Sequence, residues 1–521
     1  MTEQELFNYV KSKAIEFGIL KNSKGDPIDT KNLNAVVRHN KKDNPFFGFI
    51  REDQGPEGRY EGLSFVVFPS AVGDETITHC VVSIGIGSAT LGQDTGLAYN
   101  PGFRRSFMKL VNKDHAKNCE FFFAENWGEM DTRTPGLIEA LDKTTANTLK
   151  NTIKSYDDNK SGGREGLLPA ACLITFRPDD EKVIPVIDAW LAKYAQWRGW
   201  TSTDDAREKA NAAIQKMRAV SKNNDELKNE ILKLMGLSTD STNSTDTAGT
   251  TGNARKNKYI VLQGAPGCGK TRMALEIAKD NFDNVVFTQF HAETTYADFV
   301  YGIKPVLSGQ DLGYKGEIGV LLEAIKLAEA NEDKKVLLII DEINRANLSN
   351  VLGPVFYLFE ANAQDHNYKL KLGKIGNEDI LIDKLPDNLY VIATMNTADR
   401  SLAVVDFALR RRFTWYTLYP KKLSTAELNG KFFDDIRYNE FNDLFEKYAT
   451  DDELNLQPGH SYFILEKESD YKEAISDEMK YRLQYELMPL MKEYFNEGFL
   501  LNAKEEFCHL FFKYTHEYLY K

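Results

Sequence analysis

The apolar and polar positions of this chain divide it into regions of different periodicity. Between 256 and 420, short aliphatic runs alternate with stretches in which apolar residues recur at helical spacing. This alternation is typical of an α/β domain with a parallel sheet. From 421 to 521 the spacing is mostly helical, and we expect the many aromatic residues there to pack the core of a small helical domain.

The first 200 residues carry mixed signals and predict an α+β domain. Helical spacing occurs at 6–17 and 183–197, and strand composition occurs at 63–69, 78–84 and 121–123. A further helical stretch spans 204–235. The tract 236–252 has almost no apolar residues, so burial cannot offset its chain entropy and we expect a flexible linker.

These patterns predict four parts along the chain. They are an N-terminal target-recognition domain at 1–200, a helix and linker at 201–255, an α/β core at 256–420 and a helical lid at 421–521.

A glycine-rich loop follows the apolar strand that begins at Tyr259 and has the pattern G-x-x-x-x-G-K-T. Glycines let the backbone approach a phosphate chain, and the N–H groups of the loop can then bind the phosphate oxygens. Lys270 can reach the β- and γ-phosphates, and the Thr271 hydroxyl can hold Mg²⁺. Helical spacing follows, which puts the phosphates at a helix N-terminus. We expect a nucleoside triphosphate to contact Gly264, Ala265, Pro266, Gly267, Cys268, Gly269, Lys270 and Thr271.

A second motif ends the aliphatic run 336–340 with Asp341 and Glu342. Such a run is typical of a central parallel strand, and ligands bind at the carboxyl ends of these strands. We expect Asp341 to hold Mg²⁺, directly or through water, and Glu342 to polarise the attacking water. One carboxylate on the metal side and one on the water side suffice, because phosphoryl transfer is mainly positioning and charge neutralisation.

A third apolar strand, which begins at Leu389, ends in polar residues that include Asn396. Asn396 is placed to hydrogen-bond the γ-phosphate or the attacking water. Three consecutive arginines, Arg410 to Arg412, then follow a short helix. Taken alone they would more often be a solvated basic turn. Their position after the Asn396 strand favours a role in stabilising phosphoryl charge, often in trans from the next subunit.

The order of these motifs resembles that of the AAA+ ring ATPases. Within that class, residues 256–500 are similar to the McrB family, the GTP-hydrolysing subunits of modification-dependent restriction systems. Besides the phosphate loop, the resemblance rests on the segments 298–305, 341–347, 395–413, 459–463 and 486–495. It implies an AAA+ P-loop NTPase core with a C-terminal helical lid.

The resemblance also implies roles for particular residues and partners. Asn344 would help to orient the hydrolytic water, Asn396 and Asp399 would lie at the nucleotide site, and Arg410 or Arg411 would act in trans. The family prefers GTP over ATP, which the loop itself does not determine because phosphates do not report the base. The family further implies a homo-oligomeric ring, expected to be a hexamer, and a separate McrC-like nuclease. The chain itself has no clear Asp…Glu-x-Lys nuclease core.

In this family the N-terminal domain selects the target, commonly modified DNA. A net charge of −12 argues against a chain coated with nucleic-acid-binding charge, but a local basic groove is compatible with it. Basic clusters at 21–42 and 104–117 lie near Phe46, Phe47, Phe49, Phe103 and Phe107. This combination suits a DNA binder that flips a base. Ordinary lysines beside core aromatics are an equal alternative.

Three functions therefore stay open. The leading one is a nucleotide-driven ring motor that recognises DNA and activates a nuclease. A MoxR-like remodeller would instead use 1–200 to bind a protein, and a sensor would use nucleotide only to set its assembly state. The sequence lacks a signal peptide and a membrane-spanning run, and its five scattered cysteines show no C-x-x-C spacing. We therefore expect a cytoplasmic protein with reduced thiols and no membrane partner.

Overall fold

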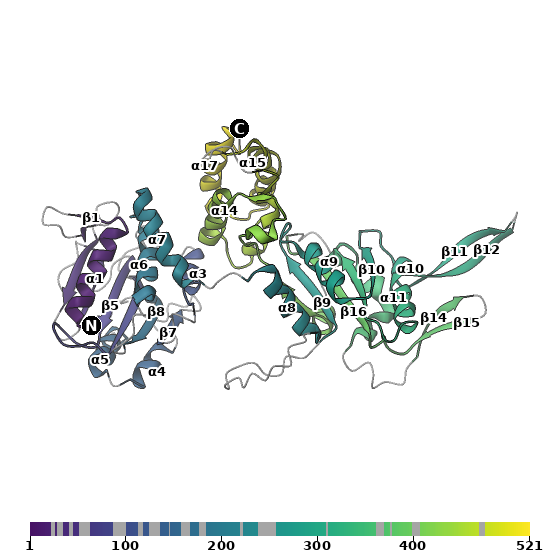
Figure 1. Cartoon of the computed structure of the whole chain (residues 1–521), viewed down its shortest axis with the longest axis horizontal. Helices are drawn as coiled ribbons and strands as arrows, with labels where there is room; N and C mark the ends of the chain where they lie inside the picture. The colour runs from purple at the N-terminus through teal and green to yellow at the C-terminus, as the bar shows by residue number, and fades with distance from the viewer. Residues whose placement is uncertain are drawn as a thin grey trace. The chain divides into compact units, whose positions relative to one another are not determined.

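The structure is a computed structural model of the chain, and its described residues form two compact units (Figure 1). Contacts group Met1–Val220 with Asp443–Thr450, and Ser221–Asn442 with Asp451–Lys521. Nearly all of the expected linker, 238–252, lies outside the described residues. The structure describes residues 1–21, 27–28, 35–40, 45–51, 63–86, 101–112, 118–123, 136–144, 146–157, 167–176, 184–218, 222–237, 257–308, 311–360, 369–375, 378–398, 407–467 and 475–520.

An eight-stranded antiparallel sheet is the framework of the first unit. The predicted strands at 63–69, 78–84 and 121–123 are its strands β5, β6 and β7. In spatial order the sheet contains β1 (Leu20–Lys21), β2 (Pro27–Ile28), β3 (Ala35–Asn40), β4 (Phe46–Arg51), β5 (Leu63–Pro69), β6 (His79–Ile86), β8 (Leu167–Thr175) and β7 (Cys119–Phe123).

Helices cover both faces of this sheet, because successive side chains of a strand point to opposite sides. Along β5, Phe65 and Val67 join a core with one group of helices, and Val66 and Phe68 join a core with the other. The first group is α1 (Glu3–Glu16), α3 (Gly102–Met108), α6 (Ile184–Arg198) and α7 (Asp204–Met217). The second group is α4 (Leu137–Asp142) and α5 (Asn147–Asp157).

Four of the aromatic rings considered for base flipping lie inside this unit. Phe47, Phe49, Phe103 and Phe107 are at most 1% exposed and belong to the first core. The alternative that they are ordinary core aromatics is therefore confirmed for these rings. The following basic residues near them lie outside the described part of the chain: Lys24, Lys31, Lys41, Lys42, Lys113 and Lys117.

The second unit is built on a five-stranded parallel sheet, as the alternation of patterns predicted. All six residues of its strand β13 are buried, which explains the unbroken aliphatic run that ends at Asp341. In spatial order the strands are β10 (Asn284–Gln289), β13 (Val336–Asp341), β16 (Leu389–Asn396), β9 (Tyr259–Gly264) and β17 (Thr414–Thr417).

Helices again cover both faces of this parallel sheet. The predicted helical stretch 204–235 forms two helices, and the second packs in this unit. It begins with a capping box, in which the Asn223 and Glu226 side chains each accept from the backbone amide of the other residue. One face carries α8 (Asn224–Met235) and α9 (Lys270–Asn281). The other face carries α10 (Tyr296–Phe299), α11 (Val320–Glu329), α12 (Leu348–Leu352) and the 3₁₀ helix η3 (Gly353–Phe359).

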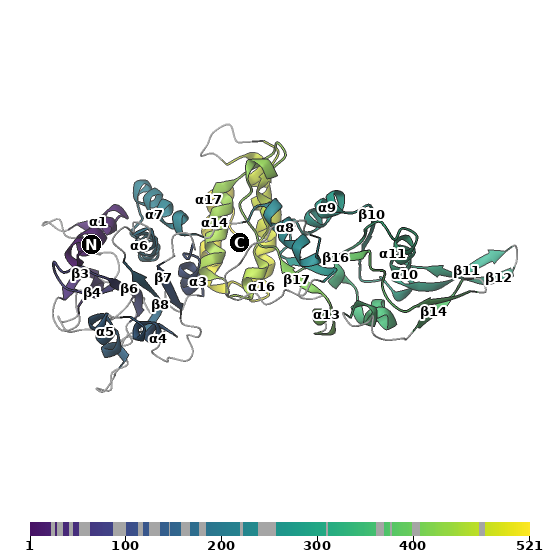
Figure 2. The same cartoon turned by 60° about the horizontal axis from the view of Figure 1, so that its bottom comes forward.

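Two β-hairpins project from the same end of the parallel sheet (Figure 2). They are formed by β11 (Tyr301–Ser308) with β12 (Asp311–Ile318), and by β14 (Leu370–Ile375) with β15 (Glu378–Ile382). The Tyr301 hydroxyl, at the base of the first hairpin, contacts the second hairpin next to its turn. It donates to the Lys374 carbonyl at 2.8 Å and accepts from the Lys374 amide at 3.2 Å.

The C-terminal part is helical, as predicted. Its core includes Phe441, Phe463, Phe507 and Phe511, whose rings contact one another edge to face or tilted. Tyr481 and Tyr485 differ from the expectation of a packed core, since both are more than half exposed. The elements are β18 (Phe432–Phe433), α14 (Asp435–Tyr448), η6 (Glu453–Leu456), η7 (His460–Phe463), β19 (Ile464–Leu465), α15 (Asp477–Arg482), the π-helix η8 (Leu483–Leu487), α16 (Met488–Asn496), η9 (Leu501–Ala503) and α17 (Lys504–Thr515).

No helix in the described part of the chain is long and apolar enough to cross a membrane.

Candidate active site

The glycine-rich loop lies between the end of β9 and the start of α9. Gly267 and Gly269 have φ values of 79° and 78°, a left-handed conformation that glycine adopts without a steric cost. Helix α9 begins directly after Gly269, at Lys270. The loop and the helix N-terminus therefore form the strand–loop–helix arrangement in which backbone N–H groups bind phosphate.

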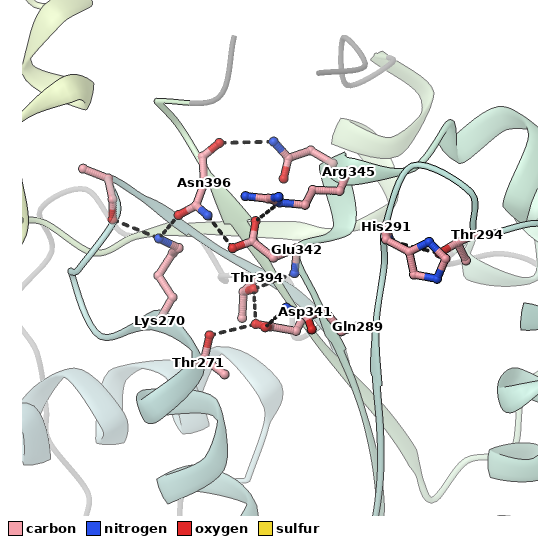
Figure 3. Close-up of polar contacts among 12 residues, drawn as sticks. Lys270, Thr271, Gln289, His291, Thr294, Asp341, Glu342, Arg345, Thr394 and Asn396 are labelled. Carbon is pink, nitrogen blue, oxygen red and sulfur yellow. Dashed lines mark hydrogen bonds and ion pairs between the residues drawn. The ribbon is translucent and has the colours of Figure 1, made fainter. Parts of the chain in front are cut away.

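Lys270 lies at the centre of the site and is only 6% exposed. Its ammonium donates to the Gly264 and Ala265 carbonyls at 3.0 and 2.9 Å, and to Asn396 Oδ1 at 2.6 Å (Figure 3). Strands β9 and β16 are neighbours, so their carboxyl ends bring the lysine and the asparagine together. The charge of a buried lysine is stabilised by these three oxygens.

Asp341 is also buried, and hydroxyl groups surround it. Its Oδ1 accepts from the Thr271 and Thr394 hydroxyls, each at 2.7 Å, and its Oδ2 accepts from Gln289 Nε2 at 3.3 Å. A carboxylate beside a threonine hydroxyl is a set of hard oxygen donors, which fits Mg²⁺. Thr271 and Asp341 are thus the residues that could hold this ion.

Glu342 has an unusual backbone conformation, with φ 55° and ψ 47°, which is uncommon outside glycine. Its amide donates to the Thr394 hydroxyl at 3.0 Å. One carboxylate oxygen accepts from Asn396 Nδ2, and the other lies 3.4 Å from Arg345 Nε (Figure 3). The turn after β13 therefore directs the carboxylate towards Asn396, whose amide contacts both Lys270 and Glu342.

Asn344 is brought to the same place by the 3₁₀ helix η2 (Ile343–Arg345). It is 4% exposed, and its Nδ2 donates to the Asn396 carbonyl at 3.2 Å. Its Oδ1 is buried and accepts no hydrogen bond in the structure. Buried polar atoms without a partner are rare, so this oxygen is a candidate for binding a water or a ligand atom.

The lid segment Gly459–Phe463 lies directly on the phosphate loop. The Gly459 amide donates to the Pro266 carbonyl at 2.9 Å, and the Ser461 amide donates to the Gly267 carbonyl at 3.1 Å. A Cβ at Gly459 would lie 2.0 Å from the Gly267 carbonyl carbon, so only glycine permits this approach. This segment is part of the family resemblance, but the sequence predicts no role for it, because its only local signal is a glycine before a polar and aromatic run.

Two titratable groups beside the loop are held neutral. Burial lowers the pKa of His460 to about 4, and the positive charge of Lys421 contributes to the decrease. Burial also raises the pKa of the Cys268 thiol to about 11. Near neutral pH, therefore, neither side chain carries charge next to the loop.

The three arginines lie in the last turn of α13 (Phe407–Arg412), which corrects the prediction that they follow the helix. The Arg410 carbonyl accepts from Trp415 Nε1 of β17 at 3.2 Å, and the Arg412 guanidinium lies over the Phe356 ring of η3. Asp399, the other residue expected at the nucleotide site, lies outside the described residues.

Comparison with known proteins agrees with this geometry. Residues 259–413 match the family model of the AAA domain, dynein-related subfamily. This part of the chain, with its parallel sheet, glycine-rich loop and strand-end carboxylates, is an AAA+ P-loop domain.

Two curated relatives identify the branch. The chain is 36% identical over 253 residues to the "Type IV methyl-directed restriction enzyme EcoKMcrB subunit" of Escherichia coli (strain K12), covering 46% of this chain and 54% of the relative. It is 30% identical over 229 residues to the "Type II restriction enzyme BsuMI component YdiS" of Bacillus subtilis (strain 168), covering 36% of this chain and 66% of the relative. The chain is therefore a McrB-like AAA+ protein that spans about half to two thirds of the length of these relatives.

Proposed function

We propose that this chain hydrolyses a nucleoside triphosphate, GTP in preference to ATP, as a subunit of a homo-oligomeric ring, a hexamer, in the cytoplasm. The ring recognises modified or foreign DNA through residues 1–200 and activates a separate McrC-like nuclease in restriction. The observation that carries the proposal is the convergence of Lys270 and Glu342 on one amide, that of Asn396, at the carboxyl ends of adjacent strands.

Each residue then has a role in phosphoryl transfer, which depends mainly on positioning and charge neutralisation. The loop N–H groups and Lys270 bind the phosphates, and Asn396 hydrogen-bonds the γ-phosphate or the water. Glu342 accepts the proton of the attacking water, and Asn344 orients that water with its buried Oδ1. Mg²⁺, held through Thr271 and Asp341, would neutralise phosphate charge.

The preference for GTP is what the resemblance to the McrB family implies. The phosphate loop does not distinguish the two nucleotides, because GTP and ATP present the same phosphates.

The test of the nucleotide part is phosphate release by the purified chain with GTP and with ATP. Lys270→Ala is the matched blank, because it removes the ammonium that would bind the phosphates. Preference for GTP, lost in Lys270→Ala, is the expected result. Preference for ATP would contradict the assignment of GTP as substrate and favour the protein-remodeller alternative. Equal phosphate release by the wild type and Lys270→Ala would contradict the assignment of the chain as a nucleoside triphosphatase.

The test of the DNA part is fluorescence anisotropy with methylated and unmethylated duplexes at several salt concentrations. Phosphate contacts release counterions, so affinity should fall steeply as salt rises. Binding that is absent at low salt, in a chain that still hydrolyses GTP, would contradict DNA recognition and leave the motor assignment intact.

A further inference from the structure

The three consecutive arginines of α13 have three different environments. Arg412 is buried, with a side chain 8% exposed and its guanidinium 4.2 Å above the Phe356 ring. Arg410 lies 5.1 Å above the Trp415 ring. Arg411 has a side chain 69% exposed. The three neighbouring arginines thus differ in their exposure and in the groups that they can contact.

One carboxylate joins two of these arginines. Glu360 follows the last residue of η3, and its Oε1 accepts from Arg411 Nη2 at 3.0 Å and from Arg412 Nη2. Arg412 is fixed by its burial and by the Phe356 ring, so it fixes the position of Glu360. Glu360 in turn restrains Arg411, the residue directly before Arg412 in the same helix turn.

This restraint matters for an arginine that acts on a neighbouring subunit. A free exposed arginine samples many rotamers, and this rotamer entropy must be lost when the side chain is fixed. A guanidinium carries five N–H donors, so a contact through Nη2 leaves donors for phosphate oxygens. An exposed side chain held by a buried anchor is therefore pre-organised for binding in trans.

We propose that Glu360 is a positioning residue for Arg411, and that Arg411 is the arginine that acts on the nucleotide of the adjacent subunit. This inference rests on the proposed function, since it requires a ring in which one subunit completes the site of the next. The competing explanation is that the Glu360 contacts only stabilise α13.

The first test is Glu360→Gln, which keeps the shape of the side chain and removes its charge. We expect kcat to fall about tenfold, KM to change less than about twofold, and the ring mass by mass photometry to be unchanged, because pre-organisation acts on the transition state. Glu378→Gln is the matched control, an exposed glutamate of the β14–β15 hairpin outside this cluster, and should match the wild type.

The second test mixes subunits. Glu360→Gln has an intact site and a misplaced arginine, whereas Glu342→Gln has a defective site and an intact arginine. In an equimolar mixture, about a quarter of the interfaces join an intact site to an intact arginine. Activity should then exceed by about fivefold that of the same amount of Glu360→Gln alone, since a trans-acting arginine is worth far more than that. A role of Glu360 in its own subunit predicts no gain.

The outcomes separate the two levels of the proposal. Wild-type kcat in Glu360→Gln, a change in KM alone, or no gain on mixing would each overturn the positioning role. If the wild type hydrolyses no more nucleotide than Lys270→Ala, the proposed function itself is overturned. If Glu360→Gln does not fold, Glu360→Asp, which keeps the charge on a shorter side chain, is used in the same mixing assay.

Discussion

The nucleotide end of the second unit, around the phosphate loop, and its arginine end, around the last turn of α13, differ in the burial of their charged side chains. Lys270 and Asp341 are at most 7% exposed, and hydrogen bonds from several strands surround them. Arg411 is mostly exposed and is held through Glu360. Groups that act within their own subunit can be fixed by the fold, but a group that acts on a neighbour must stay at the surface.

The difference also affects how each region responds to substitution. A buried charge that loses its partner is costly, whereas an exposed ion pair contributes little to stability. We therefore expect loss of a buried charge at the nucleotide end, that of Lys270 or Asp341, to alter binding, chemistry and stability together. Changes at the arginine end should alter chemistry with little effect on the fold.

The largest effect is expected for Glu342→Gln. The substitution removes the base but keeps an amide that can face Asn396, so kcat should fall about 10⁴-fold, at the upper end for a general base. Affinity for a fluorescent GTP analogue should change less than about threefold, because binding rests on the loop and Lys270. Single-turnover phosphate release checks this, and near-normal turnover would exclude Glu342 as the base.

Arg411→Ala should come next, with kcat lower by about 10³-fold, the low end of what a trans-acting arginine contributes. The melting temperature should stay within about 2 °C, because a surface ion pair is worth at most about 1 kcal/mol. Arg410→Ala is the matched control and should lose less than about tenfold, because its guanidinium lies over Trp415. The reverse order of the two variants would assign the trans role to Arg410.

A smaller effect is expected from pH at the lid contact. The folded chain holds the pKa of His460 at about 4, below the ordinary value of 6.5. The unfolded chain therefore takes up this proton first as pH falls. The free energy of unfolding is highest above pH 6.5 and decreases by about 3 kcal/mol between pH 6.5 and 4.

The measurement is urea unfolding of the wild type and of His460→Asn across this pH range. The variant should lack this part of the acid destabilisation, so the difference between the two proteins should shrink as pH falls. Parallel pH curves for the two proteins would show that His460 is not held neutral.

The smallest of these effects is expected for Gly459→Ala. The added methyl group would meet the backbone of Gly267, so the lid segment must move away from the phosphate loop at a cost of about 2 kcal/mol. The melting temperature should therefore fall, and the dissociation constant for GTP should rise. Gly313→Ala, where a Cβ would meet its nearest atom at 3.6 Å, is the control, and an equal effect there would argue against a special contact at Gly459.

Much of the second unit was predictable because local signals and tertiary structure agree there. An aliphatic run is typical of a strand buried on both faces, so β13 and the two acidic residues at its carboxyl end were predictable from the pattern. The glycine-rich loop predicted Lys270 and Thr271 in the same way. The N-terminal unit was less predictable, since antiparallel strands that pair across long loops leave little local trace of their order.

The amino-acid sequence by itself determined the parallel sheet, the phosphate loop, the strand-end carboxylates and the helical lid, because each depends on residues close together in the chain. Only the tertiary structure decided that Phe47 and Phe103 are core residues, that Gly459 lies on the loop, and that Glu360 joins Arg411 to Arg412. These contacts bring together residues about 50 to nearly 200 positions apart. Periodicity records which face of an element is buried, but not which distant segment covers it.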